Sequence, residues 1–143
     1  MNYDQDSNVK KITKSIEIVY GLRNFIGNAN KFSRNTIYIN LKSDSEITEI
    51  VIEDDGDGYP RDVLPKIGEP YLRSNNSQEK SKTGLGLGLF IGKTLLEKNF
   101  ASINCRNSKT RSGAEVIVKW NNRDLFNIWW NFFFESNKEL SSD

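Results

Sequence analysis

Residues 82–93 read KTGLGLGLFIGK, in which three glycines alternate with leucines at the start of an apolar run. Each glycine in ordered structure costs roughly 0.5–1 kcal/mol relative to alanine, so a cluster of three indicates a task that side chains would obstruct. The run that follows predicts a helix ending near Lys98. Free N–H groups at the start of such a helix attract anions, which makes a phosphate the leading candidate ligand. A flexible hinge is the alternative.

The spacing and surroundings of these glycines exclude two common phosphate-binding motifs. They follow G-x-G-x-G with no strand directly before them, unlike a dinucleotide fingerprint, and they lack the G-x-x-x-x-G-K-[ST] pattern of a P-loop. The preceding segment, GEPYLRSNNSQEKSKT at 68–83, contains few apolar residues. A loop of this length in a compact domain is usually functional or disordered. We predict that it forms a lid, from about Arg73 to Lys82, that becomes ordered when a triphosphate binds.

Upstream of the loop, residues from about Lys14 to Phe32 predict a helix with two unlike sides. Asn24, Asn28 and Lys31 fall together on one side. The opposite side is apolar, with residues at the 3, 4 and 7 spacing of a helix face, namely Ile18, Val19, Leu22, Phe25, Ile26 and Ala29.

The polar side of this helix is either a solvated surface or a binding site. Solvated helix faces normally use Glu and Lys, whereas asparagine is a weaker helix former. Amide oxygens suit a hard cation such as Mg²⁺, and the ammonium group of Lys31 suits the phosphate that this cation carries. Gly21 and Gly27 flank the same side and leave room for a ligand to approach. We therefore interpret Asn24, Asn28 and Lys31 as a candidate site for Mg²⁺ and phosphate.

A second candidate site lies where the segment EIVIEDDGDG, residues 49–58, ends in acid. In the period of a strand, Asp54 shares a face with the apolar residues before it, while Asp55 points the other way. A buried carboxylate is costly unless something donates hydrogen bonds to it, and the exocyclic amine of a nucleobase would do so. Gly56 and Gly58 would let the backbone turn closely around that base. The alternative is a plain acidic turn, since Asp-Gly is a common turn pair.

Composition excludes several classes of function. The chain carries 20 Lys and Arg against 19 Asp and Glu, so no global field favours nucleic acid or an anionic membrane. Its apolar stretches fall well short of the ~20 residues of a membrane helix, so we expect no direct membrane insertion. The absence of histidine excludes Ser-His and Cys-His mechanisms and the common zinc sites. The single cysteine, Cys105, lies in an alternating segment that favours a buried strand position over a reactive thiol.

The remaining periodic segments predict the fold class. Four segments have the character of strands, the first two joined by the polar turn KSDSE and the last two by KTRSG; they lie at 36–41, 47–55, 102–106 and 114–120. A short helix is expected within 61–67. We predict an α+β fold, a two-layer sandwich in which helices cover one face of a mixed, mostly antiparallel sheet.

The chain divides into three expected parts. Residues 1–13 are a polar lead-in that we expect to be partly disordered, and residues 14–121 form one domain. Residues 122–143 form an aromatic-rich tail with helical spacing, carried by Leu125, Phe126, Trp129, Phe132 and Phe133 and extended by Trp130 and Phe134. The tail is either a packed C-terminal helix or a surface for self-association or a partner.

Taken together, the motifs are more specific than any one of them. N-x-x-x-N-A-x-K-F at 24–32, D-x-G-x-G at 54–58 and G-x-G-x-G-L at 84–89 occur in that order. This arrangement resembles the ATP-binding domain of sensor histidine kinases, which share the Bergerat-type fold with type II topoisomerases, mismatch-repair ATPases and the ninety-kilodalton heat-shock chaperones. IVYGLRNFIGNANKFS, GEPYLRS and GLGLGLFIGKTLLEK are similar to the redox-responsive RegB/PrrB-type sensor kinases.

The resemblance implies a role for each matching residue. Asn28 would ligate Mg²⁺ with Asn24 assisting, and Lys31 would contact a phosphate; these three are the candidate catalytic residues. Phe32 would line the adenine, and Asp54 would accept its amino group. The other nucleotide-binding residues would be Gly56 and Gly58 at the purine, Tyr71 at the start of the lid, and Gly84, Leu85, Gly86, Leu87 and Gly88 at the triphosphate. Gly113 matches the last glycine of the family pattern only loosely.

The resemblance implies that the γ-phosphoryl group of ATP is transferred to a histidine on a separate dimerisation domain. A response regulator would then receive the phosphoryl group from that histidine. The family's phosphoacceptor histidine precedes this region, and this chain has none. A stand-alone protein-serine kinase of the anti-sigma type and a nucleotide-gated interaction module are the alternatives. Relatives that attack with a hydroxyl have glutamate where this chain has Asn24, which favours the histidine acceptor, although Glu17 and Glu69 stay open as bases. The implied location is the cytoplasmic side of a parent protein in the bacterial inner membrane.

Overall fold

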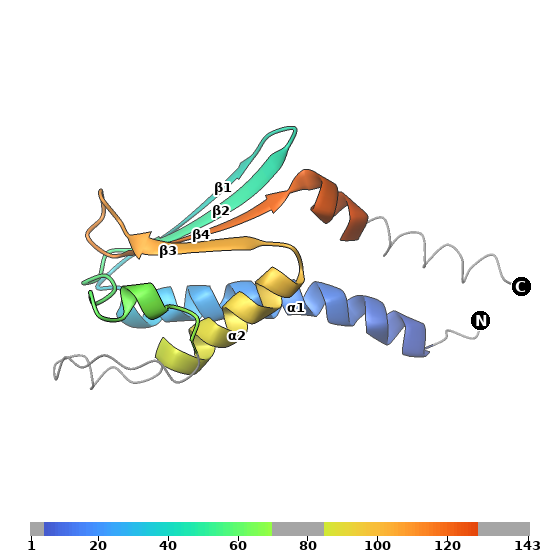
Figure 1. Ribbon diagram of the computed structural model, residues 1–143, viewed down its shortest axis with the longest axis horizontal. Helices are drawn as coiled ribbons and strands as arrows, with labels where there is room; N and C mark the ends of the chain where they lie inside the picture. Colours follow the sequence, from blue (N-terminus) through green and yellow to red (C-terminus); the bar gives the residue numbers. More distant parts are fainter. Residues whose placement is uncertain (1–4, 70–84, 129–143) are drawn as a thin grey trace, which may run out of the picture.

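The computed structural model describes residues 5–69 and 85–128 (Figure 1). In chain order the elements are α1 (Gln5–Phe32), β1 (Ile37–Ser43), β2 (Ile47–Asp54), the short 3-10 helix η1 (Leu64–Lys66), α2 (Leu85–Lys98), β3 (Ser102–Asn107) and β4 (Ala114–Asn121). Residues 122–128 continue as a helix directly after β4. The predicted lid, together with Tyr71 and Gly84, lies outside the described residues.

The four strands form one sheet in the order β1-β2-β4-β3, and α1 and α2 cover one face of it (Figure 1). Every pairing within the described sheet is antiparallel. The two predicted hairpins are confirmed: β1 pairs with β2 across residues 44–46, and β3 pairs with β4 across residues 108–113. The predicted two-layer α+β sandwich is therefore confirmed.

The core lies between the helices and the inner face of the sheet, as the alternation of the strands requires. Ile52 of β2 and Val118 of β4 are almost fully buried, and on α1 Phe25 is 1% exposed. The buried indole of Trp120 donates from Nε1 to the carbonyl of Asn99 at 3.1 Å, which satisfies its one polar group and fastens the end of β4 to the turn after α2.

The two helices pack antiparallel and very close together. Glu17 lies beside Lys98 at one end of the contact, and Asn24 lies beside Gly88 at the other. At the crossing, a Cβ on Gly21 would come within 2.6 Å of Leu96 Cγ. Gly21 was expected to make room for a ligand, and that interpretation is wrong: it makes room for α2.

The first helix begins at Gln5 rather than near Lys14 as predicted. The added residues are mostly polar and carry too weak a period to mark a helix from sequence, but extending a helix that has already formed costs little. Val19, which was expected on the apolar side, is 60% exposed. Within the described residues no helix is both long and apolar enough to cross a bilayer.

Candidate functional site

Asp54, the last residue of β2, is only 2% exposed. Its inward direction follows from the strand period, and it completes the row of Ile50 and Ile52. Its Oδ1 atom accepts hydrogen bonds from the backbone N–H of Gly56 at 2.8 Å and of Ala114 at 3.3 Å. Backbone donors from two separate segments therefore stabilise a carboxylate placed inside the core.

Two glycines allow the chain to close around this carboxylate. A Cβ on Gly113 would overlap the backbone carbonyl and Oδ1 of Asp54, so only glycine fits directly before β4. A Cβ on Gly56 would overlap the carbonyl of Phe32 at the end of α1. Gly113 matched the family pattern only loosely in the sequence, but the structure brings it against Asp54.

Asn107 holds the turn that follows Asp54. Its Oδ1 accepts from the backbone N–H of Tyr59 at 2.6 Å, and its Nδ2 donates to the carbonyl of the same residue at 3.1 Å. Gly58 adopts a φ of +79°, and a Cβ there would come within 2.7 Å of Asn107 Oδ1. Sequence reasoning missed Asn107, because nothing in the polar end of β3 signals a contact with a turn that precedes it by about fifty residues.

Tyr59 and Cys105 are neighbours behind this turn. Burial raises the pKa of the Tyr59 hydroxyl well above its usual value, and Cys105 and Asp54 add to the shift. Burial also raises the pKa of the Cys105 thiol, to about 11. The thiol is therefore protonated at neutral pH, which fits the prediction that it is not a reactive cysteine. Cys105 lies on β3 as predicted, but it is half-buried rather than buried.

Asp55 points away from the core, as predicted, and has a different task. It accepts hydrogen bonds from the backbone N–H groups of Arg34 at 2.8 Å, Asn35 at 3.1 Å and Thr36 at 3.2 Å. The pKa of this carboxyl is lowered, first by the bond from Asn35. Asp55 thereby fixes the connection between α1 and β1, and an ion pair between Arg34 and Asp57 lies beside it.

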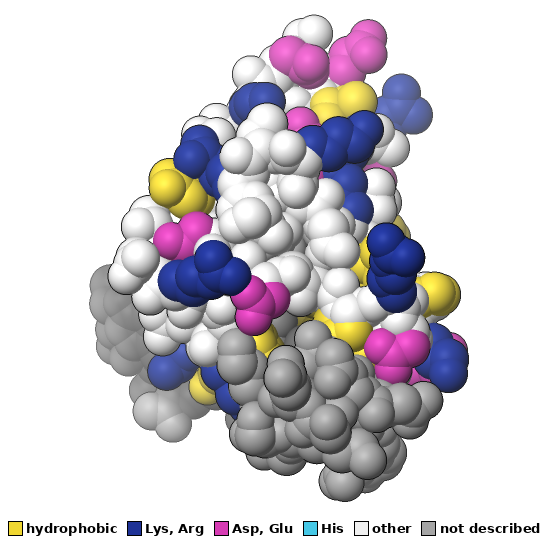
Figure 2. Space-filling view, turned by 90° about the vertical axis from the view of Figure 1, so that its left-hand side faces the viewer, with side chains coloured by type: hydrophobic (Ala, Val, Ile, Leu, Met, Phe, Trp, Pro, Cys, Tyr) yellow, Lys and Arg dark blue, Asp and Glu magenta, His cyan; other side chains and the backbone are white. Residues whose placement is uncertain are grey.

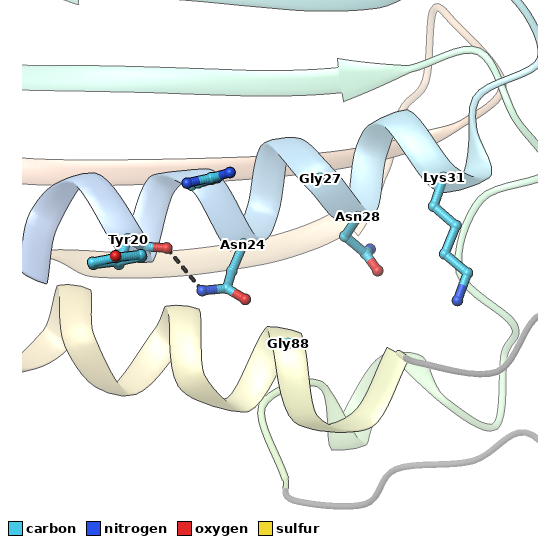
Figure 3. Close-up of a pocket in the computed structure, with 7 residues that line it drawn as sticks. Tyr20, Asn24, Gly27, Asn28, Lys31 and Gly88 are labelled. Carbon is cyan, nitrogen blue, oxygen red and sulfur yellow. Dashed lines mark hydrogen bonds between the residues drawn. The ribbon is translucent and has the colours of Figure 1, made fainter.

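Asn24, Asn28 and Lys31 line a single pocket on α1, as the sequence predicted. The pocket has a volume of about 380 Å³, and its other lining residues are Tyr20, Arg23, Gly27 and Gly88. Figure 3 shows the three predicted side chains projecting from α1 on the side of Gly88. Tyr20 and Arg23 were not predicted. Tyr20 lies four residues before Asn24, and Arg23 lies four residues before Gly27, so helical spacing was the available signal.

Within the pocket, the amide of Asn24 is oriented by its own helix. Its Nδ2 donates to the carbonyl of Tyr20 at 2.8 Å (Figure 3). A Cβ on Gly88 would lie 3.5 Å from Asn24 Oδ1, so this oxygen faces α2. A Cβ on Gly27 would meet no atom within 4 Å. Packing therefore does not account for a glycine in the last part of α1, where it costs about 1 kcal/mol.

The other predicted residues lie around these two centres. Phe32 is half-buried at the end of α1, and the Lys31 ammonium lies 5.6 Å from the centroid of its ring. Leu85 and Gly86 form the first turn of α2, and Leu87 is 49% exposed there. Viewed from the end of the molecule that carries the β3–β4 turn, Lys and Arg side chains flank the surface with acidic ones interspersed (Figure 2).

Glu17 and Glu69, which the sequence left as alternative general bases, do not line the pocket. Glu17 instead accepts from Lys98 Nζ at 2.8 Å and from Asn99 Nδ2 at 2.9 Å, which fastens it to the far end of α2. Glu69 is exposed.

Comparison with known proteins identifies the family of the chain. Residues 13–124 match the family described as histidine kinase-, DNA gyrase B- and HSP90-like ATPase. The chain belongs to this family. The match begins within α1 and includes α2 and the four described strands.

Among curated proteins, the sensor histidine kinase RegB of Cereibacter sphaeroides is 37% identical over 76% of this chain. The sensor protein RstB of Escherichia coli is 29% identical over 69% of it. This chain spans 27% of the length of RegB and 23% of that of RstB, so it corresponds to one part of such proteins.

Solved structures agree on the fold. A mycobacterial sensor histidine kinase, MprB, superposes with a TM-score of 0.59 at 24% identity, covering 71% of this chain and 70% of that one. The nucleotide-free catalytic domain of the histidine kinase ThkA superposes with a TM-score of 0.60 at 21% identity, covering 74% and 67%.

Proposed function

We propose that this chain is the ATP-binding catalytic domain of a sensor histidine kinase, which transfers the γ-phosphoryl group of ATP to a histidine on a separate dimerisation domain. The parent protein would lie in a bacterial inner membrane with this domain on the cytoplasmic side, and it would pass the phosphoryl group to a response regulator. The observation that carries the proposal is the buried Asp54, an acceptor positioned by two backbone donors in a member of an ATPase family.

The residues around Asp54 fit an adenine. Its carboxylate would accept from the exocyclic amine, a group that guanine replaces with a carbonyl oxygen. Gly56 and Gly113 allow backbone segments to approach where side chains would overlap other atoms. Phe32 at the end of α1 would contact the base, and Gly58 would complete the turn beside it.

The residues of the α1 pocket fit Mg²⁺ and phosphates. Asn28 would provide an amide oxygen to the metal with Asn24 beside it, and the Lys31 ammonium would contact a phosphate. Bound Mg²⁺ would neutralise charge that develops on the triphosphate. The lid with Tyr71 and the glycines 84, 86 and 88 with Leu85 and Leu87 would enclose the phosphates from the side of α2.

The choice between a histidine and a serine acceptor rests on whether a general base lines the pocket. A hydroxyl or water must lose a proton as it attacks, whereas imidazole already offers a lone pair. No described residue that lines the pocket is a carboxylate, and Glu17 is bound to Lys98 and Asn99. This supports a histidine acceptor over a serine acceptor, and it predicts slow hydrolysis of ATP by the chain alone.

Calorimetry with ATP and GTP in the presence of Mg²⁺ tests the binding site. ATP should bind much more tightly, because guanine would place a carbonyl oxygen against Asp54, and such mismatches cost on the order of 10⁴-fold. Equal affinity for the two nucleotides would contradict the assignment of Asp54.

Radiolabelled ATP tests the reaction. The chain alone should acquire no label. Addition of the cognate histidine-bearing hairpin should give phosphate on that hairpin that is labile in acid and stable in base, as a phosphoramidate is. Acid-stable label on this chain or on a serine of a partner would overturn the proposal in favour of a serine kinase. Binding of ATP without transfer to any histidine would leave a nucleotide-gated interaction module.

A further inference from the structure

The N-terminal half of α1 and the helix at residues 122–128 both extend to the same end of the molecule (Figure 1). There α1 extends beyond α2 and the sheet. Leu125 packs against the same core cluster as Ile18 and Leu22 of α1. The start of the C-terminal helix and the middle of α1 therefore both border the core of the domain.

Both of these helices also carry exposed apolar side chains. On α1, Val19 is 60% exposed and Ile16 is 38% exposed; on the C-terminal helix, Phe126 is 61% exposed. In the sequence, Val9 and Ile12 precede Ile16 and Val19 with a spacing of three, four and three, which is the spacing of an apolar helix stripe.

We propose that the C-terminal segment of this chain, residues 129–143, forms a helix that packs along the stripe of α1 defined by Val9, Ile12, Ile16 and Val19. The contact would brace the helix that carries Asn24, Asn28 and Lys31. The proposal does not depend on the nature of the phosphoryl acceptor.

The sequence of the segment fits this partner in its apolar pattern. Phe126, Trp129 and Phe133 continue at spacings of three and four, as the α1 stripe does. Two such stripes bury one another when their helices lie side by side.

The charges fit as well. The helix after β4 runs toward the end where α1 begins, so a continuation of it would lie antiparallel to α1 (Figure 1). Its later residues would then approach the basic start of α1. That start carries Lys10, Lys11 and Lys14 against Asp6, and the segment carries Glu135, Glu139 and Asp143 against Lys138.

The anchoring of the C-terminal helix favours packing within one chain over packing between two. Asn122, its first residue, accepts from Thr48 Oγ1 at 2.6 Å and donates to the carbonyl of Asp44 at 2.7 Å. Its backbone N–H donates to the carbonyl of Glu46 at 2.8 Å. With its start fixed to the β1–β2 turn, the segment has an effective concentration at α1 on the order of millimolar, well above that of a second copy in dilute solution.

A double-mutant cycle on the full chain tests the contact. Val19→Asp should lower the melting temperature by about 3 °C in the otherwise native chain. It should lower it by less than about 1 °C in a chain that already carries Trp129→Ser and Phe133→Ser. Ile91→Asp is the matched control, because Ile91 is also an exposed aliphatic residue in the middle of a helix, on α2. Its effect should be equal in both chains.

Acrylamide quenching of tryptophan fluorescence gives a second measurement in fully folded protein. Val19→Asp should increase quenching, since Trp129 and Trp130 would lose their cover, while Ile91→Asp should not. Equal effects of Val19→Asp in both chains, or no change in quenching, would overturn the proposal. Sedimentation as a dimer that the two tail substitutions convert to a monomer would also overturn it, because the occupant of the stripe would then be a second copy.

Discussion

Asp54 and Asn28 belong to the two halves of one candidate site, but they are held in different ways. Asp54 is 2% exposed and depends on contacts among β2, β4 and the end of α1. Asn24, Asn28 and Lys31 all project from one helix into an open pocket. Substitutions that add atoms around Asp54 should therefore destabilise the fold, whereas substitutions in the α1 pocket should weaken binding without destabilising it.

Asp54→Asn should give the largest effect and should separate binding from folding at the buried half. Its Oδ1 could still accept from Gly56 and Ala114, so the fold should persist, but its amide group would oppose the amine of adenine. We expect ATP affinity to fall at least about 10³-fold by calorimetry. Asp55→Asn is the matched control and should bind ATP nearly as the native chain does. Retention of affinity in Asp54→Asn would show that the carboxylate is not the adenine acceptor.

Gly113→Ala should give the next largest effect, through stability. The added Cβ overlaps the Asp54 carbonyl and Oδ1, so β4 would have to move away from β2. We expect the free energy of unfolding in urea to fall by about 3 kcal/mol. An unchanged unfolding midpoint would mean that the two strands are less closely constrained at Asp54 than the structure indicates.

Asn28→Ala tests the open half. The substitution removes the amide oxygen that Asn28 would provide to the Mg²⁺ ion, which should weaken ATP binding in the presence of Mg²⁺ by roughly 10- to 100-fold. Stability should change by no more than about 0.5 kcal/mol, because the pocket is open. With EDTA in place of Mg²⁺, the native chain and the variant should bind ATP with similar affinity. A persistent difference without metal would assign Asn28 to the nucleotide itself.

Gly27→Ala sharpens the contrast between the two kinds of glycine. Because nothing lies within 4 Å of the added Cβ, the substitution should stabilise α1 by up to about 1 kcal/mol in the urea experiment, opposite in sign to Gly113→Ala. If the open space serves the ligand, ATP affinity should fall at the same time. Destabilisation by Gly27→Ala would contradict the open pocket.

Asp55→Asn should have the smallest effect on stability, and this effect should depend on pH. Backbone hydrogen bonds, first that from Asn35, lower the pKa of Asp55 in the folded chain. A carboxyl with a lowered folded pKa stabilises the fold above its unfolded pKa of about 3.9, and this contribution is lost as pH falls through the folded pKa. The native chain should therefore be more stable than Asp55→Asn at pH 7, and the difference should shrink below about pH 4. A difference independent of pH would contradict the role of the charge.

The sequence by itself determined the features that depend on local periodicity. The helical period placed Asn24, Asn28 and Lys31 together, and the strand period sent Asp54 inward and Asp55 outward. Both follow from backbone geometry, which repeats every 3.6 residues in a helix and every 2 in a strand. The antiparallel hairpins also followed from polar turns between alternating segments, because a short connection leaves few other arrangements.

Only the tertiary structure decided which distant residues complete the site. Three contacts join segments that are far apart in the chain. They are the close approach of Gly113 to Asp54, the hydrogen bonds between Asn107 and Tyr59, and the ion pair between Glu17 and Lys98. The sequence predicted that Gly21 makes room for a ligand, but its proximity to Leu96 assigns it to helix packing. Such contacts depend on the register of β2 against β4 and on the crossing of α1 over α2. A local pattern carries no information on these arrangements, because they are set by the packing of the whole core.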